Sequence, residues 1–278
     1  MSITIFENLL NSTPLLEKDI KNVTEEKLIN LYNNNNINIS IPKIIHLIYF
    51  KERDLCNYHL RCINSMLKYM PDYKIIIYND IEPINNSIWN ELKQNNNIEI
   101  KYKERPSHFD DYKLNYVQYQ ADIVRLEILY EYGGIYLDLD ILLIKNFDTI
   151  FTSNKDLYIS KDSPNKDSGL INAFMAAKPK NEFIKIWLNK IKAGIRMNIW
   201  EYNISVTNKK LLEKNLHYKY KYNIEIIDYH HFFPIDWRDK HIYESIQPYN
   251  FKIDTYGVHL WDTILHDVLK YNKFFPNV

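Results

Sequence analysis

The sequence predicts an α/β fold in which a central, mostly parallel β-sheet is flanked by helices. Apolar runs of strand length alternate with segments of helical periodicity from residue 41 onward. A helical pattern at 121–132 leads through two glycines directly into a further apolar run. The chain has 278 residues and 46% hydrophobic content, enough to bury the core of one large domain. Strand–helix–strand units of this kind are joined by right-handed crossovers, which make the sheet parallel.

The elements follow in order along the chain. Residues 1–40 are expected to form a helical accessory segment that ends in the polar break at 33–36, and residues 41–278 form the main domain. Periodicity and end signals define the elements of that domain. We expect strands at 41–50, 74–78, 98–102, 134–138 and 224–228, and helices at 54–69, 85–93, 121–132 and 183–192.

Two aspartates, Asp138 and Asp140, end the strand that begins at Gly134. Side chains two residues apart on an extended strand leave the same face, about 6.6 Å apart along the backbone. Two carboxylates held this closely favour a cation. Oxygen ligands favour a hard divalent ion such as Mg²⁺ or Mn²⁺. Acidic pairs of this type also occur as solvated strand ends, so the pair indicates a metal site only in combination with its surroundings.

The helix before this strand carries Asp122 and Arg125 near its start. The helix from Asp122 to Gly133 descends about 16 Å, and the strand from Gly134 to Asp138 climbs back about 13 Å. All four charged groups are therefore expected at one edge of the sheet, where open α/β sheets bind ligands. The alternative is an exposed i, i+3 ion pair without a function.

Several ordered motifs resemble one known family. They are Ile41–Tyr49, the Ala121-Asp122 pair with Arg125 and Leu129, the run Tyr-Gly-Gly-Ile-Tyr-Leu-Asp-Leu-Asp at 132–140, the region of Asn172, and His259-Leu260-Trp261. Together they are similar to the sugar transferases of glycosyltransferase family 32, over roughly residues 41 to 262. This group includes outer-chain and inositol-phosphoceramide mannosyltransferases and capsular sugar transferases.

The resemblance implies a GT-A-type fold that transfers a sugar from a nucleotide-diphosphate sugar, UDP- or GDP-linked, to a hydroxyl of a glycan, glycolipid or protein. It also implies Mn²⁺ or Mg²⁺ as cofactor and retention of the anomeric configuration. By motif, Asp140 is the direct metal ligand and Asp138 contacts the metal or the ribose. His259 is a further candidate ligand and closes over the diphosphate together with Trp261.

The resemblance assigns the remaining site residues in the same way. Asp122 and Arg125 hold hydroxyls of the donor sugar, and Tyr49 lies near the base. Asn172 belongs to a segment that passes beside the donor sugar and the acceptor, although an asparagine after an apolar run is also common in turns. Tyr49 replaces the usual tryptophan, and Thr263-Ile264 replaces the usual serine and tryptophan. These departures leave the nucleotide and the sugar open.

Composition excludes several other classes. Lys+Arg and Asp+Glu both number 35, so no basic excess favours nucleic acid. With five glycines, the chain has no dinucleotide-binding or P-loop motif. The two cysteines, Cys56 and Cys62, are too awkwardly spaced for a disulfide or a metal pair. Without a secretory signal or a run of eighteen apolar residues, we expect a soluble, cytoplasmic protein, with contact to a membrane face left open.

The sequence supports four further interpretations. His46 lies in a near-continuous apolar strand and is expected to be structural. The predicted strand at 224–228 runs into His230 and His231; neighbours on a strand face opposite sides, so the two histidines should not share a metal. A phosphohydrolase with Asp138 as nucleophile is disfavoured, because three strands precede it and Leu142 stands where a threonine or valine is usual. A catalytically idle nucleotide-sugar-binding or scaffold protein of the same fold is the main alternative to an enzyme.

Overall fold

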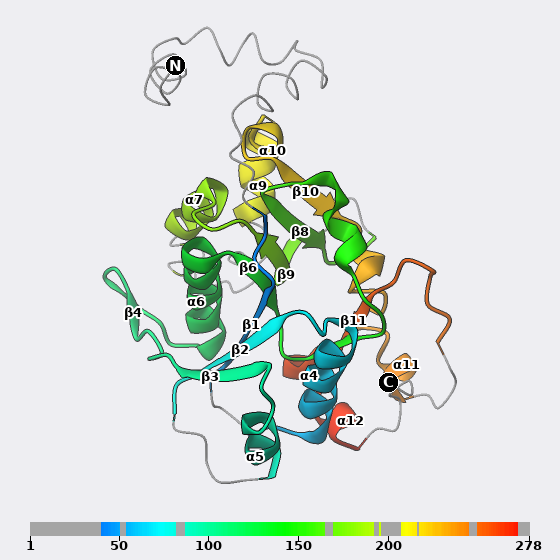
Figure 1. The fold of residues 1–278 in the computed structure, drawn as a ribbon. Coiled ribbons are helices and arrows are strands. Elements are labelled where there is room, and N and C mark those ends of the chain that lie inside the picture. Colours follow the sequence, from blue (N-terminus) through cyan, green and yellow to red (C-terminus); the bar gives the residue numbers. More distant parts are fainter. Residues whose placement is uncertain are drawn as a thin grey trace, which may run out of the picture.

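The structure is a computed structural model that describes residues 40–50, 54–81, 87–164, 169–191, 195, 207–215, 217–244 and 249–271 (Figure 1). The predicted accessory segment therefore lies outside the described residues, apart from residue 40. The described part has a seven-stranded sheet and two small two-stranded sheets. This arrangement confirms the α/β fold class that the sequence predicts.

The bounds of the strands and helices are as follows. The strands are β1 (Ile44–Tyr49), β2 (Lys74–Asn79), β3 (Ile98–Tyr102), β4 (His108–Phe109), β5 (Tyr112–Lys113), β6 (Gly134–Leu137), β7 (Ile141–Leu143), β8 (Leu157–Lys161), β9 (Leu170–Ala177), β10 (Ile224–Ile227) and β11 (Gly257–His259). The α-helices are α4 (Asn57–Tyr69), α5 (Ser87–Lys93), α6 (Val117–Tyr132), α7 (Glu182–Lys190), α9 (Thr207–Lys214), α10 (Tyr218–Lys221), α11 (Lys240–Glu244) and α12 (Asp262–Tyr271). The described residues also form two 3₁₀ turns, η1 (Asp148–Ser153) and η3 (Tyr229–His231).

The large sheet has the order β10-β8-β9-β6-β1-β2-β3. β6, β1, β2 and β3 are parallel to their neighbours within this half, and β10 is parallel to β8. β9 is the exception, because it runs antiparallel to both β6 and β8. The carboxyl end of β6 therefore lies beside the first half of β9, which brings residues near 138 and 172 together.

Apolar side chains cover both faces of this sheet. Along each central strand, neighbouring residues belong to opposite cores: Leu47 and Ile48 in β1, Ile135 and Tyr136 in β6. One core contains residues of α4 and α5, and the other contains residues of α6 and α7. In Figure 1, α6 and α7 lie on one side of the sheet and α4 on the other. Burial on both sides explains why these strands are nearly continuous apolar runs.

Two glycines join α6 to β6 where the chain has no room for side chains. Gly133 has φ 64° and Gly134 has φ 92°. A Cβ on Gly133 would lie 2.6 Å from the Pro179 nitrogen, and one on Gly134 would lie 2.8 Å from the Ile44 carbonyl oxygen. Gly133 ends the helix as predicted, but its ψ of −157° lies outside the left-handed helical region that was expected for the cap.

His46 is a buried structural residue, in agreement with the sequence-based expectation. Its Nε2 lies 2.9 Å from the Gly133 carbonyl oxygen, and its Nδ1 lies 3.3 Å from the Tyr78 hydroxyl. Burial lowers the pKa of His46 to about 4, although the bond to Gly133 opposes this. The neutral ring therefore donates from Nε2 and fixes the helix end against β1.

None of the described helices combines the length and the apolar character needed to cross a lipid bilayer. The cytoplasmic location inferred from the sequence stays a prediction.

Candidate active site

Asp138 and Asp140 lie in a turn, not on a strand. β6 ends at Leu137, and the amide of Ile141 donates to the Asp138 carbonyl at 3.0 Å. The prediction that the two carboxylates leave the same face of one strand was therefore wrong. The two carboxylates nevertheless converge, because both approach Nε2 of His259, Asp138 at 3.6 Å and Asp140 at 3.3 Å.

His259 reaches the aspartates because a distant segment pairs with the chain just after them. β11 runs antiparallel to β7, with His259 opposite Ile141. The ring is buried against Phe233, with 5.4 Å between the ring centroids. Burial would lower the pKa of His259, but the charges of Asp140 and Asp138 outweigh it and raise the pKa to about 9. The two acids thus create a site that favours positive charge.

The same segment also holds Asp140 through its backbone. The amide of Leu260 donates to the Asp140 carbonyl at 3.0 Å, and the amide of Asp262 donates to Asp140 Oδ2 at 2.7 Å. Asp140 Oδ1 faces His259. Its carboxylate is therefore fixed by residues more than a hundred positions later in the sequence.

Asp138 is held from the other side, by Arg125 and Tyr136. Arg125 Nη1 donates to Asp138 Oδ1 at 3.0 Å, and the Tyr136 hydroxyl donates to the same oxygen at 2.8 Å. The guanidinium also lies over the Tyr136 ring, 4.5 Å from its centroid. Burial would raise the pKa of Asp138, but Arg125 and the hydrogen bonds from His259 and Tyr136 lower it to about 2. The carboxylate is thus ionised at neutral pH.

Asp122, Arg125 and Asn172 form one buried network beside the aspartates. The side chains of Asp122 and Arg125 are only 1% and 8% exposed, so the alternative of a surface ion pair is wrong. Asn172 Nδ2 donates to Asp122 Oδ1 at 2.9 Å, and Asn172 Oδ1 accepts from Arg125 Nη1 at 3.1 Å. Asn172 lies within β9, so the alternative of a turn residue is also wrong.

Tyr49 and Trp261 lie at the same cleft. Tyr49 packs edge-on against Trp89, with 5.6 Å between the ring centroids. Trp261 has φ 57°, a strained value for a tryptophan, and its ring lies 4.3 Å from that of His259. Its indole N–H donates to the Ile235 carbonyl at 2.9 Å. This hydrogen bond orients the indole ring, and closure of Trp261 over a diphosphate stays a prediction.

A cleft of about 1060 Å³ collects every residue that the sequence singled out as a site candidate. Its walls include Tyr49, Asp122, Arg125, Asp138, Asp140, Asn172, His259 and Trp261. A volume of this order is at the upper end of ordinary small-molecule sites and accommodates a ligand with several linked groups.

Two residues of the site were not assigned a role from the sequence. Tyr136 donates to Asp138 and lies two residues before it in the run at 132–140. Asp262 connects the site to α4: Tyr58 donates to its carboxylate, and its Oδ2 lies 3.6 Å from His59 Nε2. The only signal for Asp262 is its position directly after Trp261.

Comparisons with known proteins identify similar sequences and folds. Residues 57–156 match the family described as "Glycosyltransferase sugar-binding region containing DXD motif". Inositol phosphoceramide mannosyltransferase 3 of Schizosaccharomyces pombe is 28% identical over 55% of this chain and 39% of its own length. Lactosylceramide 4-alpha-galactosyltransferase of Mus musculus is 25% identical over 62% of this chain and 48% of its own length. The chain thus spans less than half of the length of either relative.

A solved structure, "PaToxG Glycosyltransferase", resembles the fold with a TM-score of 0.50 and 20% identity, covering 69% of this chain and 79% of that one. The fold is therefore of the GT-A type. Over residues 57–156 the sequence resembles glycosyltransferases of family 32, and the matched region contains Asp138 and Asp140 of the DXD motif.

Proposed function

We propose that this protein transfers a sugar from a nucleotide-diphosphate sugar to a hydroxyl acceptor, with the help of a divalent cation. One observation carries the proposal: ligand atoms of Asp138, Asp140 and His259 lie within 4.8 Å of one another, at the cleft. Two carboxylate oxygens and an imidazole nitrogen suit Mn²⁺ or Mg²⁺ when the diphosphate supplies further oxygens.

The residues fit such a cation on a second ground. The pair of aspartates raises the pKa of His259 to about 9, so without a metal a proton fills the cationic position. A cation bound here would be held by Asp140 directly, with Asp138 and His259 beside it. When bound, it neutralises charge that develops on the nucleoside diphosphate as the glycosidic bond breaks.

The other site residues have positioning and binding roles in this proposal. Arg125 holds Asp138 ionised and in place through a 3.0 Å bond, and Asn172 holds both Arg125 and Asp122. Asp122 and Arg125 line the cleft, where they would accept and donate hydrogen bonds to hydroxyls of the donor sugar. Tyr49, packed on Trp89, offers an aromatic surface for the base.

The proposed donor and acceptor rest on the names of the relatives. The names of the two relatives specify a mannosyl and a galactosyl group, and both specify acceptors that contain ceramide. We therefore propose a hexose, carried by UDP or GDP, and a glycan, glycolipid or protein hydroxyl as acceptor, with glycolipids to be tested first. Retention of the anomeric configuration is expected from the family resemblance.

The test is a panel of UDP- and GDP-hexoses with Mn²⁺, Mg²⁺ or EDTA. We expect hydrolysis or transfer from at least one donor, dependent on the cation and lost in Asp140→Asn with the fold intact by circular dichroism. Asp111→Asn is the matched control, because Asp111 is exposed and outside the cleft. Binding of a nucleotide sugar without turnover would instead identify the idle binding protein. The absence of both binding and turnover would refute both functions.

A further inference from the structure

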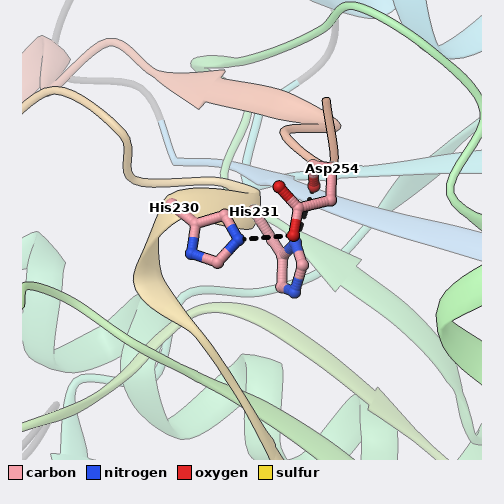
Figure 2. Close-up of side chains that lie close together, drawn as sticks. All are labelled: His230, His231 and Asp254. Carbon is pink, nitrogen blue, oxygen red and sulfur yellow. Dashed lines mark hydrogen bonds and ion pairs between the residues drawn. The ribbon is translucent and has the colours of Figure 1, made fainter. Parts of the chain in front are cut away.

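A second group of metal-binding side chains lies outside the cleft. His230, His231 and Asp254 each have a ligand atom within 4.8 Å of those of the other two. Figure 2 shows both imidazole rings next to the Asp254 side chain. His230 Nε2 lies 2.8 Å from Asp254 Oδ2, and His231 Nδ1 lies 2.7 Å from the Asp254 carbonyl oxygen.

The prediction that these histidines face opposite sides was wrong because they do not lie on a strand. β10 ends at Ile227, and the two residues form part of the 3₁₀ turn η3. In a helical turn, successive side chains are rotated by about 120° and do not alternate between two faces. The ring centroids are only 4.4 Å apart, and both rings lie beside Asp254 (Figure 2).

His230 has the surroundings of a metal ligand. Its Nδ1 lies 3.1 Å from Asp228 Oδ1, while its Nε2 faces Asp254. A carboxylate on one ring nitrogen fixes the tautomer and directs the other nitrogen toward a metal. The three candidate ligands are half-buried, so a water molecule can complete a tetrahedral set.

We propose that His230, His231 and Asp254 form a second divalent-metal site, of the kind that binds Zn²⁺. Two imidazoles and one carboxylate are softer than the acidic pair of the cleft, which favours zinc over Mg²⁺. Zinc ligands lie about 2.0–2.2 Å from the metal, so in a tetrahedron they are about 3.3 Å apart. The ligand atoms lie within 4.8 Å of one another, so binding requires side-chain rotations that bring them closer together. Binding replaces the proton between His230 and Asp254 and releases it to solvent.

The position of the cluster indicates what the metal does. η3 continues into Phe232, whose carbonyl accepts the amide of His259 at 2.9 Å, and Phe233, which packs on His259. The segment of Asp254 continues into β11, which carries His259. A metal at the cluster therefore holds together the two segments that position His259, without contact to the cleft.

The experiment uses Asp140→Asn as background, so that the acidic pair in the cleft does not complicate the count of bound metal. Metal-free, tag-free protein is titrated with Zn²⁺ by calorimetry and with Co²⁺ by visible absorption. We expect one Zn²⁺ per chain, a higher melting temperature with Zn²⁺, and a Co²⁺ spectrum of nitrogen and oxygen ligands without thiolate bands. Nucleotide-sugar turnover plays no part in these measurements, so the proposed function stands or fails separately.

Variants then assign the ligands. In the same background, Asp254→Asn and His230→Gln should each weaken Zn²⁺ binding at least tenfold and remove the thermal shift. His108→Gln is the matched control, because His108 is exposed at β4, and it should leave both unchanged. The proposal is overturned if the background protein binds no Zn²⁺, or if binding survives both substitutions. Circular dichroism at each step separates loss of binding from loss of folding.

Discussion

Replacement of Arg125 by lysine tests whether the guanidinium organises the site. Arg125 donates to Asp138 and to the side-chain and backbone oxygens of Asn172, and its Nη2 lies 3.4 Å from Asp122. A lysine ammonium keeps the charge but lacks the planar fork, so it cannot serve both aspartates and Asn172. At least one charge-assisted hydrogen bond in a buried place is lost, which costs about 1.5–3 kcal/mol of unfolding free energy.

The expected loss converts into measurable quantities. For a chain of this size, it lowers the melting temperature by roughly 3–12 °C. Release of Asp138 should also lower kcat/KM at least tenfold, or about 1.4 kcal/mol. Arg61→Lys is the control, since Arg61 is exposed on α4. If Arg125→Lys has the same melting temperature and the same cation-dependent turnover as the unsubstituted protein, the contacts of Arg125 do not organise the site.

Three further predictions concern the parts of the fold that support the site. Burial lowers the pKa of His46 from 6.5 to about 4, so as the pH falls the unfolded chain binds this proton before the folded protein does; the stability from the neutral ring is complete above pH 6.5, and about 3 kcal/mol of it is lost as the pH falls to 4. Urea unfolding measured against pH should show this slope. A slope that persists in His46→Gln would contradict the assignment to His46. Gly134→Ala should cost at least about 2 kcal/mol in urea unfolding, because its φ is 92° and the new Cβ meets the Ile44 carbonyl; a neutral result would mean that the glycine pair has no steric role. Phe232→Ala should cost about 3–5 kcal/mol, because the ring is fully buried and stacked on Phe174 with 4.1 Å between centroids; a loss below 1 kcal/mol would show that this core is not close-packed.

Local patterns were sufficient for the elements that lead to the site. β3 has the predicted bounds, and β1, β2 and α4 differ from prediction only at their ends. These elements have clear periodicity or apolar runs of strand length. The return of Arg125 to the level of Asp138 was also predicted, because it follows from helix rise and strand rise alone.

Other parts could not be predicted from one sequence. The alternation Leu-Asp-Leu-Asp at 137–140 continues the period of a strand, yet the chain turns after Leu137, because the Asp138 amide donates to Ala173 and that of Ile141 to Asp138. β9 is buried at all eight positions and has no alternation to mark it as a strand. β7 and β11 have three residues each, and only their pairing defines them.

The two aspartates of the motif depend on different halves of the chain, and this gives the cleft its chemical asymmetry. Asp138 is held by Arg125 and Tyr136, which lie within thirteen residues of it, so this half forms with α6 and β6. Asp140 is held by the amides of Leu260 and Asp262, so its geometry depends on docking of β11 against β7. His259 contacts both carboxylates. A cation at this position would need both carboxylates, so its binding should stabilise the attachment of the carboxyl-terminal segment. Loosening of that segment should in turn weaken binding of the cation without disturbing the network of Arg125 and Asn172.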